Sequence, residues 1–227
     1  MFFDEYYLIL VVPALIISVV CQIMVSMAFG KYKKVGNSKG LTGAEVAQQL
    51  MRDYGINDVR IERVSGNLSD HYDPRSKVLR LSDSVYGSTS VAAIGVAAHE
   101  TGHAIQHASA YGPLWLRSLL VPAARIGSSV GPYMAVIGLV VGIGALTDFG
   151  ILLFGAAVLF YLITLPVEIN ASTRALAMLR EHQILSEDEM YGSKKVLQAA
   201  AMTYVASALV AMANLARLML LRGQRRR

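Results

Sequence analysis

Two histidines four residues apart, with a glutamate beside the first, form the pattern in this sequence that most directly indicates chemistry. The segment is His99-Glu100-Thr101-Gly102-His103. Positions i and i+4 of a helix share one face, so both imidazoles can bind one metal ion. Glu100 then lies beside the metal, where a carboxylate can take a proton from a zinc-activated water molecule. The spacing therefore predicts a zinc site with Glu100 as general base.

A catalytic zinc site needs a third protein ligand and an open fourth position. His107 lies about 12 Å along a helix axis from His99, at 1.5 Å per residue, so one helix cannot wrap all three histidines around one ion. A third histidine with the metzincin spacing would fall at position 109, which is Ser109. The remaining ligand is therefore expected to be a carboxylate. Glu168 is the candidate, because an acid at the end of an apolar segment is costly unless it pairs or binds a metal.

Several assignments stay open at this point. Glu168 could instead form an interfacial ion pair with Arg174. His107 is expected to contact a ligand from outside the metal site, to gate the site, or to be structural only. His182 lies in a polar stretch and is expected to be solvated. Peptide hydrolysis also needs a group that stabilises the oxyanion, and the sequence does not choose among four candidates. These candidates are His71, His107, Tyr191 and Tyr204.

The composition favours a membrane protein. Of 227 residues, 54% are hydrophobic and 16% are charged, whereas a soluble domain carries about 25% charged residues. The net charge of +5 could indicate nucleic-acid binding, but eight of the 21 basic residues flank the first and last apolar segments. They are Lys31, Lys33, Lys34, Lys39, Arg222, Arg225, Arg226 and Arg227. Because the basic excess belongs to these flanks, nucleic-acid binding is not expected.

The apolar segments predict three or four transmembrane helices. The first, residues 7–29, is an anchor, and the lysines that follow it place residue 31 onward in the cytoplasm. Residues 126–146 and 150–167 form a membrane hairpin, with a polar break at Thr147-Asp148. The last apolar segment, residues 199–221, is undecided, because a fourth crossing would place its terminal arginines outside.

Residues 31–116 read as a small α+β insert. Thr42 and Glu45 form a capping box that begins a short helix. Residues 59–64 and 77–82 alternate apolar and polar types and predict two strands, with turns between them. An Ala-rich helix, residues 89–109, carries the two histidines. Trp115 fits either a membrane interface or a core.

The expected fold is a mainly α membrane protein with three to four transmembrane helices and a cytoplasmic, zincin-like α+β insert. Four segments follow from this organisation: an N-terminal transmembrane anchor, the insert with the histidine helix, the membrane hairpin, and a cytoplasmic helical segment with the last apolar helix. They cover residues 1–30, 31–116, 117–168 and 169–227.

Several stretches of the chain resemble membrane zinc metallopeptidases of the gluzincin type, in particular the YugP-type neutral zinc metallopeptidases of bacteria. These stretches are Asp70-His71-Tyr72-Asp73-Pro74, Arg80-Leu81-Ser82, residues 97–107 and residues 165–175. The resemblance implies one Zn²⁺ bound by His99, His103 and Glu168, with Glu100 as catalytic base. It also implies a multi-pass protein of a bacterial cell membrane.

The chain is more distantly similar to the HtpX-like membrane proteases. In that family an aspartate four residues after the ligand glutamate orients a zinc-bound histidine. The corresponding residue here is Ser172. A hydroxyl orients an imidazole less strongly than a carboxylate does, so the groups that hold the ligands are expected to differ.

The expected function is a membrane-embedded zinc metalloendopeptidase that hydrolyses peptide bonds near the cytoplasmic membrane surface. Its substrates would be membrane proteins or membrane-proximal peptides, and residues 78–81 would bind them if that strand lies at a sheet edge. The alternative is a non-catalytic, zinc-stabilised membrane scaffold or chaperone-like subunit. A structural zinc site usually closes its fourth position with Cys or His, and Cys21 is far from the motif in sequence.

Overall fold

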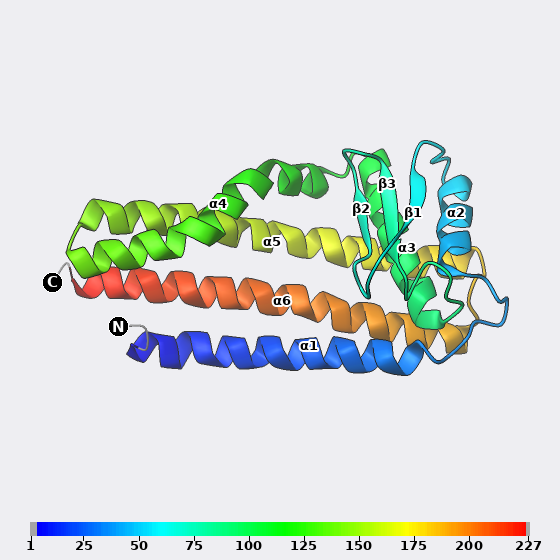
Figure 1. Cartoon of the computed structure of the whole chain (residues 1–227), viewed down its shortest axis with the longest axis horizontal. Helices are drawn as coiled ribbons and strands as arrows, with labels where there is room; N and C mark the ends of the chain where they lie inside the picture. The colour runs from blue at the N-terminus through cyan, green and yellow to red at the C-terminus, as the bar shows by residue number, and fades with distance from the viewer. Residues whose placement is uncertain (1–3, 226–227) are drawn as a thin grey trace. The chain divides into compact units, whose positions relative to one another are not determined.

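A computed structural model of the chain describes residues 4–225 and is mainly helical (Figure 1). A π-helical turn, Tyr7–Val11, leads into the first helix. The helices are α1 (Val12–Tyr32), α2 (Gly43–Asp53), α3 (Val91–Ala108), α4 (Gly112–Val141), α5 (Gly144–Glu181) and α6 (Glu187–Gln224). The strands are β1 (Arg60–Val64), β2 (His71–Asp73) and β3 (Val78–Ser82). Arg226 and Arg227 of the basic C-terminal segment lie outside the described residues.

The chain divides into two compact units, each assembled from separate stretches of sequence. Unit 1 comprises residues 1–22, 115–166 and 202–227, and unit 2 comprises residues 23–114 and 167–201. Four helices that contribute to unit 1 are long and apolar enough to cross a membrane. They are Tyr7–Tyr32, Gly112–Val141, Gly144–Glu181 and Glu187–Gln224. The last apolar segment, undecided from sequence, is therefore a candidate span like the other three.

The turn of the hairpin between α4 and α5 lies five residues before its predicted position. Gly142 has a φ of +82°, which favours glycine, and its N–H donates to the carbonyl of Gly138. The predicted break at Thr147-Asp148 is wrong, because both residues lie in the first turns of α5. Asp148 is accommodated there by Arg222 of α6, whose Nε lies 2.8 Å from Asp148 Oδ1.

Contacts of α6 bring the two described ends of the chain together within unit 1. Arg217 donates its Nε–H to Asp4 Oδ2 at 2.9 Å, and Gln224 Nε2 donates to the hydroxyl of Tyr6 at 2.8 Å. Together with the Arg222–Asp148 pair, these contacts place the first and last described residues near the hairpin end of α5. Trp115 has 65% of its surface exposed, so the alternative that it belongs to a core is wrong.

Unit 2 contains a three-stranded sheet in the order β1-β3-β2. β1 pairs with β3 in parallel and β2 pairs with β3 antiparallel. The two predicted strands match β1 and β3 within one residue at each end, but β2 lies in the region predicted as turns. The expectation that residues 78–81 could form a substrate-binding edge is wrong, because β3 is the central strand and β2 is an edge.

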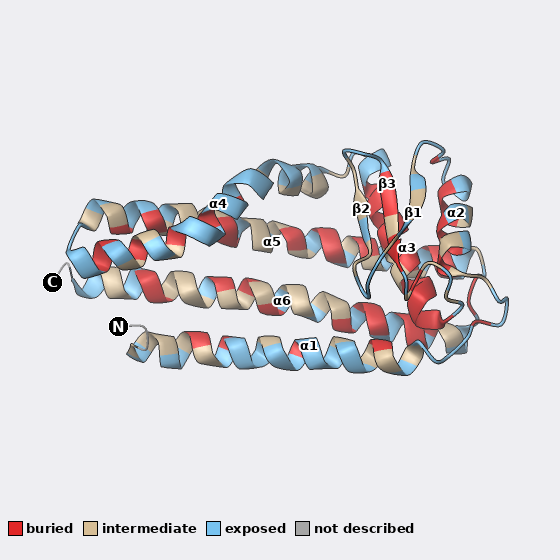
Figure 2. Cartoon of the chain, viewed as in Figure 1, coloured by how far each residue is buried: buried red, intermediate tan, exposed pale blue. Residues whose placement is uncertain are grey.

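Helix α3 packs against α2 and against strands β2 and β3, behind which it runs in Figure 1. The capping box predicted for α2 is present: Thr42 Oγ1 accepts the N–H of Glu45, whose carboxylate accepts the N–H of Thr42. Ser90 caps the start of α3. The alanine-rich body of α3 is almost entirely buried, as is β3 (Figure 2). Small side chains let neighbouring elements approach α3 closely, which fixes the backbone that carries the histidines.

Candidate metal centre and active site

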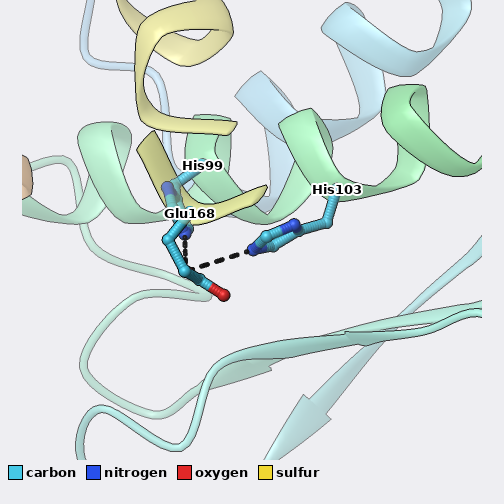
Figure 3. Close-up of side chains that lie close together, drawn as sticks. All are labelled: His99, His103 and Glu168. Carbon is cyan, nitrogen blue, oxygen red and sulfur yellow. Dashed lines mark hydrogen bonds and ion pairs between the residues drawn. The ribbon is translucent and has the colours of Figure 1, made fainter. Parts of the chain in front are cut away.

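Helix α3 presents the two histidines of the motif on one face, as the spacing predicts. The ring centroids of His99 and His103 lie 4.8 Å apart. Their side chains keep 12% and 10% of their surface exposed. Both Nε2 atoms point toward one carboxylate, that of Glu168 on α5 (Figure 3).

Glu168 completes a cluster of three groups that could hold a metal ion. Its Oε2 lies 3.3 Å from His99 Nε2 and 3.5 Å from His103 Nε2, and the three atoms all lie within 4.8 Å of one another. Two imidazole nitrogens and one carboxylate oxygen are a donor set that zinc accepts, with a fourth position left for water or substrate. The Glu168 side chain is 3% exposed. A carboxylate buried this deeply fits a ligand role well.

Arg174, the alternative partner of Glu168, contacts another residue on the same helix. Its Nε–H donates to Asn170 Oδ1 at 2.8 Å, and its guanidinium lies 6.0 Å from the centre of the Tyr111 ring. The structure thus places Glu168 with the two histidines. It also places Glu168 inside α5 and not at a helix end, because α5 continues to Glu181.

A close approach of α3 and α5 brings Glu168 within reach of the histidines. A Cβ atom added at Gly102 would lie 2.8 Å from the carbonyl oxygen of Ala171 and 3.3 Å from its Cα. No side chain larger than hydrogen fits there without moving one helix. The glycine inside the histidine motif therefore has a packing role, and Ala171, three residues after Glu168, is its partner.

Both histidines are held through the nitrogen that faces away from Glu168. His99 Nδ1 lies 3.1 Å from the hydroxyl oxygen of Ser172, and His103 Nδ1 lies 2.9 Å from Gln106 Oε1. Each ring is thereby fixed in orientation, and its Nε2 is directed at Glu168. Ser172 thus occupies the orienting position that the comparison with HtpX-like proteases raised. Gln106 was not singled out from the sequence, although it lies one turn after His103 in a buried helix.

Glu100 is buried beside the cluster and is held by the edge strand of the sheet. Its Oε2 accepts the backbone N–H of Tyr72 in β2 at 3.0 Å. The Tyr72 hydroxyl in turn lies 2.8 Å from His107 Nδ1. Tyr72 therefore contacts α3 at two points separated by two helical turns. This role of Tyr72 was not predicted, because 28 residues separate Tyr72 from Glu100 in sequence.

Burial and neighbouring carboxylates set the ionisation of this region. Burial lowers the pKa of His103, but the hydrogen bond with Glu168 and the charge of Glu100 outweigh it, and the net shift is upward. Burial raises the pKa of Tyr72 to about 12, so its hydroxyl keeps its proton at neutral pH. Burial also raises the pKa of Asp70, whose carboxylate accepts from the N–H and the hydroxyl of Ser82.

The other candidates from the sequence are located as follows. His71 is exposed, and its Nδ1 lies 2.8 Å from the carbonyl of Ser69. Tyr191 lies on α6 with 58% of its surface exposed, and Tyr204 belongs to unit 1. His182, expected to be solvated, is partly buried, and its Nδ1 lies 3.1 Å from a carboxylate oxygen of Asp53. Of the oxyanion candidates, His107 is the one whose partner also contacts Glu100.

Comparison with known proteins connects this geometry to a family. Residues 7–223 match the family described as "Putative neutral zinc metallopeptidase". The chain is 45% identical over 215 residues to "Putative membrane protease YugP" of Bacillus subtilis (strain 168). The aligned region covers 95% of this chain and 96% of the relative. No solved structure matches significantly. A family match over nearly the whole chain, with a membrane protease as relative, shows that this chain belongs to the neutral zinc metallopeptidase family.

Proposed function

We propose that the chain is a membrane zinc metalloendopeptidase that holds one Zn²⁺ through His99, His103 and Glu168. The observation that carries the proposal is the convergence of their three ligand atoms within 4.8 Å of one another. Glu100 follows His99 directly in α3 and is the general base. The spacing of the histidines and the depth of Glu168 both fit a catalytic site with one open position.

Zinc, when bound, polarises the scissile carbonyl and makes a water molecule acidic enough to lose a proton near neutral pH. Glu100 accepts that proton and passes it to the leaving amine. The Tyr72 N–H donates to Glu100 Oε2 and so fixes the orientation of the carboxylate, with Oε1 as the other oxygen that can accept the proton. We therefore assign the proton transfer to Oε1 of Glu100.

The group that stabilises the oxyanion is, in this proposal, the Tyr72–His107 pair. His107 lies two turns after Glu100 on the same helix, and Tyr72 contacts both residues. The high pKa of Tyr72 keeps its hydroxyl available as a hydrogen-bond donor. A donor held in place before the reaction stabilises developing charge without reorganisation.

An extended peptide would bind along β2, the edge of the sheet that carries Tyr72. An edge strand offers backbone groups to a substrate strand, and side-chain pockets then give selectivity. This role replaces the one expected for β3. The substrates we propose are membrane proteins or membrane-proximal peptides, because α5 contains both an apolar segment of span length and the ligand Glu168.

We further propose that the site faces the cytoplasm. Lys31 in the last turn of α1 and three lysines that follow the helix, at residues 33, 34 and 39, favour a cytoplasmic position for the segment after α1. At the other end of α1, the arginines of α6 have acidic partners, as Arg217 pairs with Asp4 and Arg222 with Asp148. This pairing reduces the positive charge that would oppose an external C-terminus.

Proteolysis by the purified full-length protein in liposomes tests the proposed activity. The wild type and a Glu100→Gln variant are incubated with a panel of membrane proteins, before and after zinc removal by a chelator. We expect cleavage by the zinc-loaded wild type, none after chelation, and recovery when zinc is added back. A Glu100→Gln variant that cleaves as fast as the wild type would overturn the mechanism and favour the scaffold alternative.

A further inference from the structure

Gln106 connects one proposed zinc ligand to the helix that carries another. Its side chain is completely buried, with 0% of the residue exposed. Oε1 lies 2.9 Å from His103 Nδ1, and Nε2 lies 2.8 Å from the carbonyl oxygen of Val167 and 2.9 Å from Asn170 Oδ1. From these contacts we infer that Gln106 is the positioning residue that locks His103 in its metal-binding tautomer. This inference rests on the proposed zinc site.

The orientation of the Gln106 amide follows from its partners. The carbonyl of Val167 can only accept a hydrogen bond, so the amide nitrogen must face it. Asn170 must likewise present its oxygen, because Asn170 Oδ1 also receives the Nε–H of Arg174, which can only donate. The amide oxygen of Gln106 therefore faces His103.

The tautomer of His103 follows in turn. An amide oxygen can only accept, so His103 Nδ1 must carry a hydrogen. In a neutral imidazole the other nitrogen, Nε2, then carries the free electron pair. Nε2 is the atom that faces Glu168 at 3.5 Å. Gln106 thus presents His103 in the one neutral form that can bind a metal through Nε2, before any metal arrives.

His99 has no equivalent lock in its contact with Ser172. A hydroxyl can donate or accept, so the 3.1 Å contact between Ser172 Oγ and His99 Nδ1 is compatible with either tautomer. The tautomer of His103 is therefore fixed by its partner, whereas that of His99 is not. An acidic residue at position 172 would fix the tautomer of His99. In this chain a neutral amide, that of Gln106, fixes the tautomer of His103 instead.

Gln106 also sets the spacing between the two ligand-bearing helices. Val167, whose carbonyl accepts from Gln106, directly precedes Glu168, so one side chain ties the ligand of α3 to the backbone beside the ligand of α5. The two halves of the amide have separate tasks: Oε1 orients His103, and Nε2 holds α5. This separation allows the positioning role to be distinguished from a purely structural one.

The test compares three variants of the full-length protein by zinc affinity, from chelator competition, and by the Tm of the metal-free form. Gln106→Met removes both halves of the amide and is expected to raise the zinc Kd about 10- to 100-fold. Gln106→Glu keeps an acceptor for His103 and loses the donor to α5, so it is expected to restore at least part of that affinity. Ser193→Ala is the control, because Ser193 is equally buried and also bonds α3, at the carbonyl of Val91.

Ser193→Ala is expected to lower the metal-free Tm and to leave the zinc Kd unchanged within about twofold. Nitrogen-15 spectra of the metal-free protein, recorded at a pH high enough to keep the histidines neutral, provide the second measurement: neutral His103 should be in the Nδ1–H form in the wild type and a mixture of both tautomers in Gln106→Met. The inference is overturned if wild type and Gln106→Met bind zinc equally, or if Gln106→Glu binds no better than Gln106→Met. A wild type that binds no zinc would instead contradict the proposed function.

Discussion

The carboxylates of Glu100 and Glu168 lie in one buried region, yet their partners differ in kind. Glu168 Oε2 faces two imidazole nitrogens, whereas Glu100 Oε2 accepts a backbone N–H from β2. A carboxylate between two imidazoles is suited to a metal, and one held by an N–H is suited to accept a proton. The two glutamates are the same residue type, so the different roles that we propose for them follow from their neighbours.

Replacing Tyr72 with phenylalanine tests the oxyanion assignment at the scale of one hydroxyl. Tyr72→Phe keeps the backbone N–H that holds Glu100 and removes only the group that contacts His107. Because one oxyanion donor is lost, kcat is expected to fall about 10²-fold with zinc content unchanged. Steady-state kinetics on a cleaved substrate measure this, and an unchanged kcat would exclude Tyr72 as a donor.

The sequence predicted the residues of the site whose roles follow from local spacing. His99, Glu100 and His103 are recognised because one helix turn brings them together, and Glu168 because a buried acid needs a partner. Tyr72 and Gln106 have roles that depend on pairing across elements: a strand against α3, and α3 against α5. Such pairings leave no periodic pattern in the sequence.

At the scale of elements, the packing of α3 on α5 decides whether the proposed ligands meet. Gly102 packs against Ala171 with no room for a Cβ atom, and Gln106 bonds α5 one turn farther along α3. Their partners on α5, Ala171 and Val167, lie on either side of Glu168 in sequence. The geometry of the site therefore depends on the distance between two helices more than on any loop.

A methyl group at Gly102 should separate these helices. Gly102→Ala places a Cβ 2.8 Å from the Ala171 carbonyl, and overpacking of this kind costs about 1–3 kcal/mol of stability. Glu168 would move away from the histidines, so weaker zinc binding is expected together with a lower Tm.

Gly155→Ala is the matched control, because nothing lies within 4 Å of an added Cβ there and alanine favours helix. It should leave stability and zinc affinity as they are or raise stability slightly. Thermal unfolding and chelator competition on both variants check the prediction. Equal zinc affinity in the two variants would show that the helix spacing at Gly102 does not matter.

Helices and strands were predicted well where the residues that specify them lie close together in sequence. The capping box of α2, the strands β1 and β3 and the histidine helix all follow from residues within a few positions of one another. Strand β2 and the start of α5 could not be predicted from nearby residues in this way. β2 has three residues, too few for an alternating pattern. The polar pair Thr147-Asp148 suggested a turn, because Arg222, the residue that pairs with Asp148, lies 74 residues away in sequence.

At the scale of the whole molecule, the basic excess noted in the sequence has two different environments. Lys33, Lys34 and Lys39 follow α1 in a segment of mainly polar residues, whereas Arg222 is paired with Asp148 inside unit 1. Four candidate spans and the contacts between the chain ends fit an even number of crossings, with both termini on one side. Arg222, one of the terminal arginines that left the last apolar segment undecided, is paired with Asp148.

Labelling of single cysteines tests this topology. In a Cys21→Ala background, Lys39→Cys and Gln224→Cys are expected to react from opposite faces of the membrane. A membrane-impermeant maleimide applied to intact bacterial cells should label position 224, and position 39 only after the cells are opened. Labelling of both positions from outside would contradict four crossings, and labelling of position 39 alone would invert the proposed orientation.

The central claim is that two buried glutamates divide the tasks of binding zinc and of using it. The most direct measurement is the zinc content of purified Glu168→Gln and Glu100→Gln proteins, two chemically identical replacements. The account predicts that Glu100→Gln keeps one zinc per chain, as the wild type does, and that Glu168→Gln loses zinc during purification. Zinc retained at the wild-type level by Glu168→Gln, or lost from Glu100→Gln in an otherwise folded protein, would contradict it.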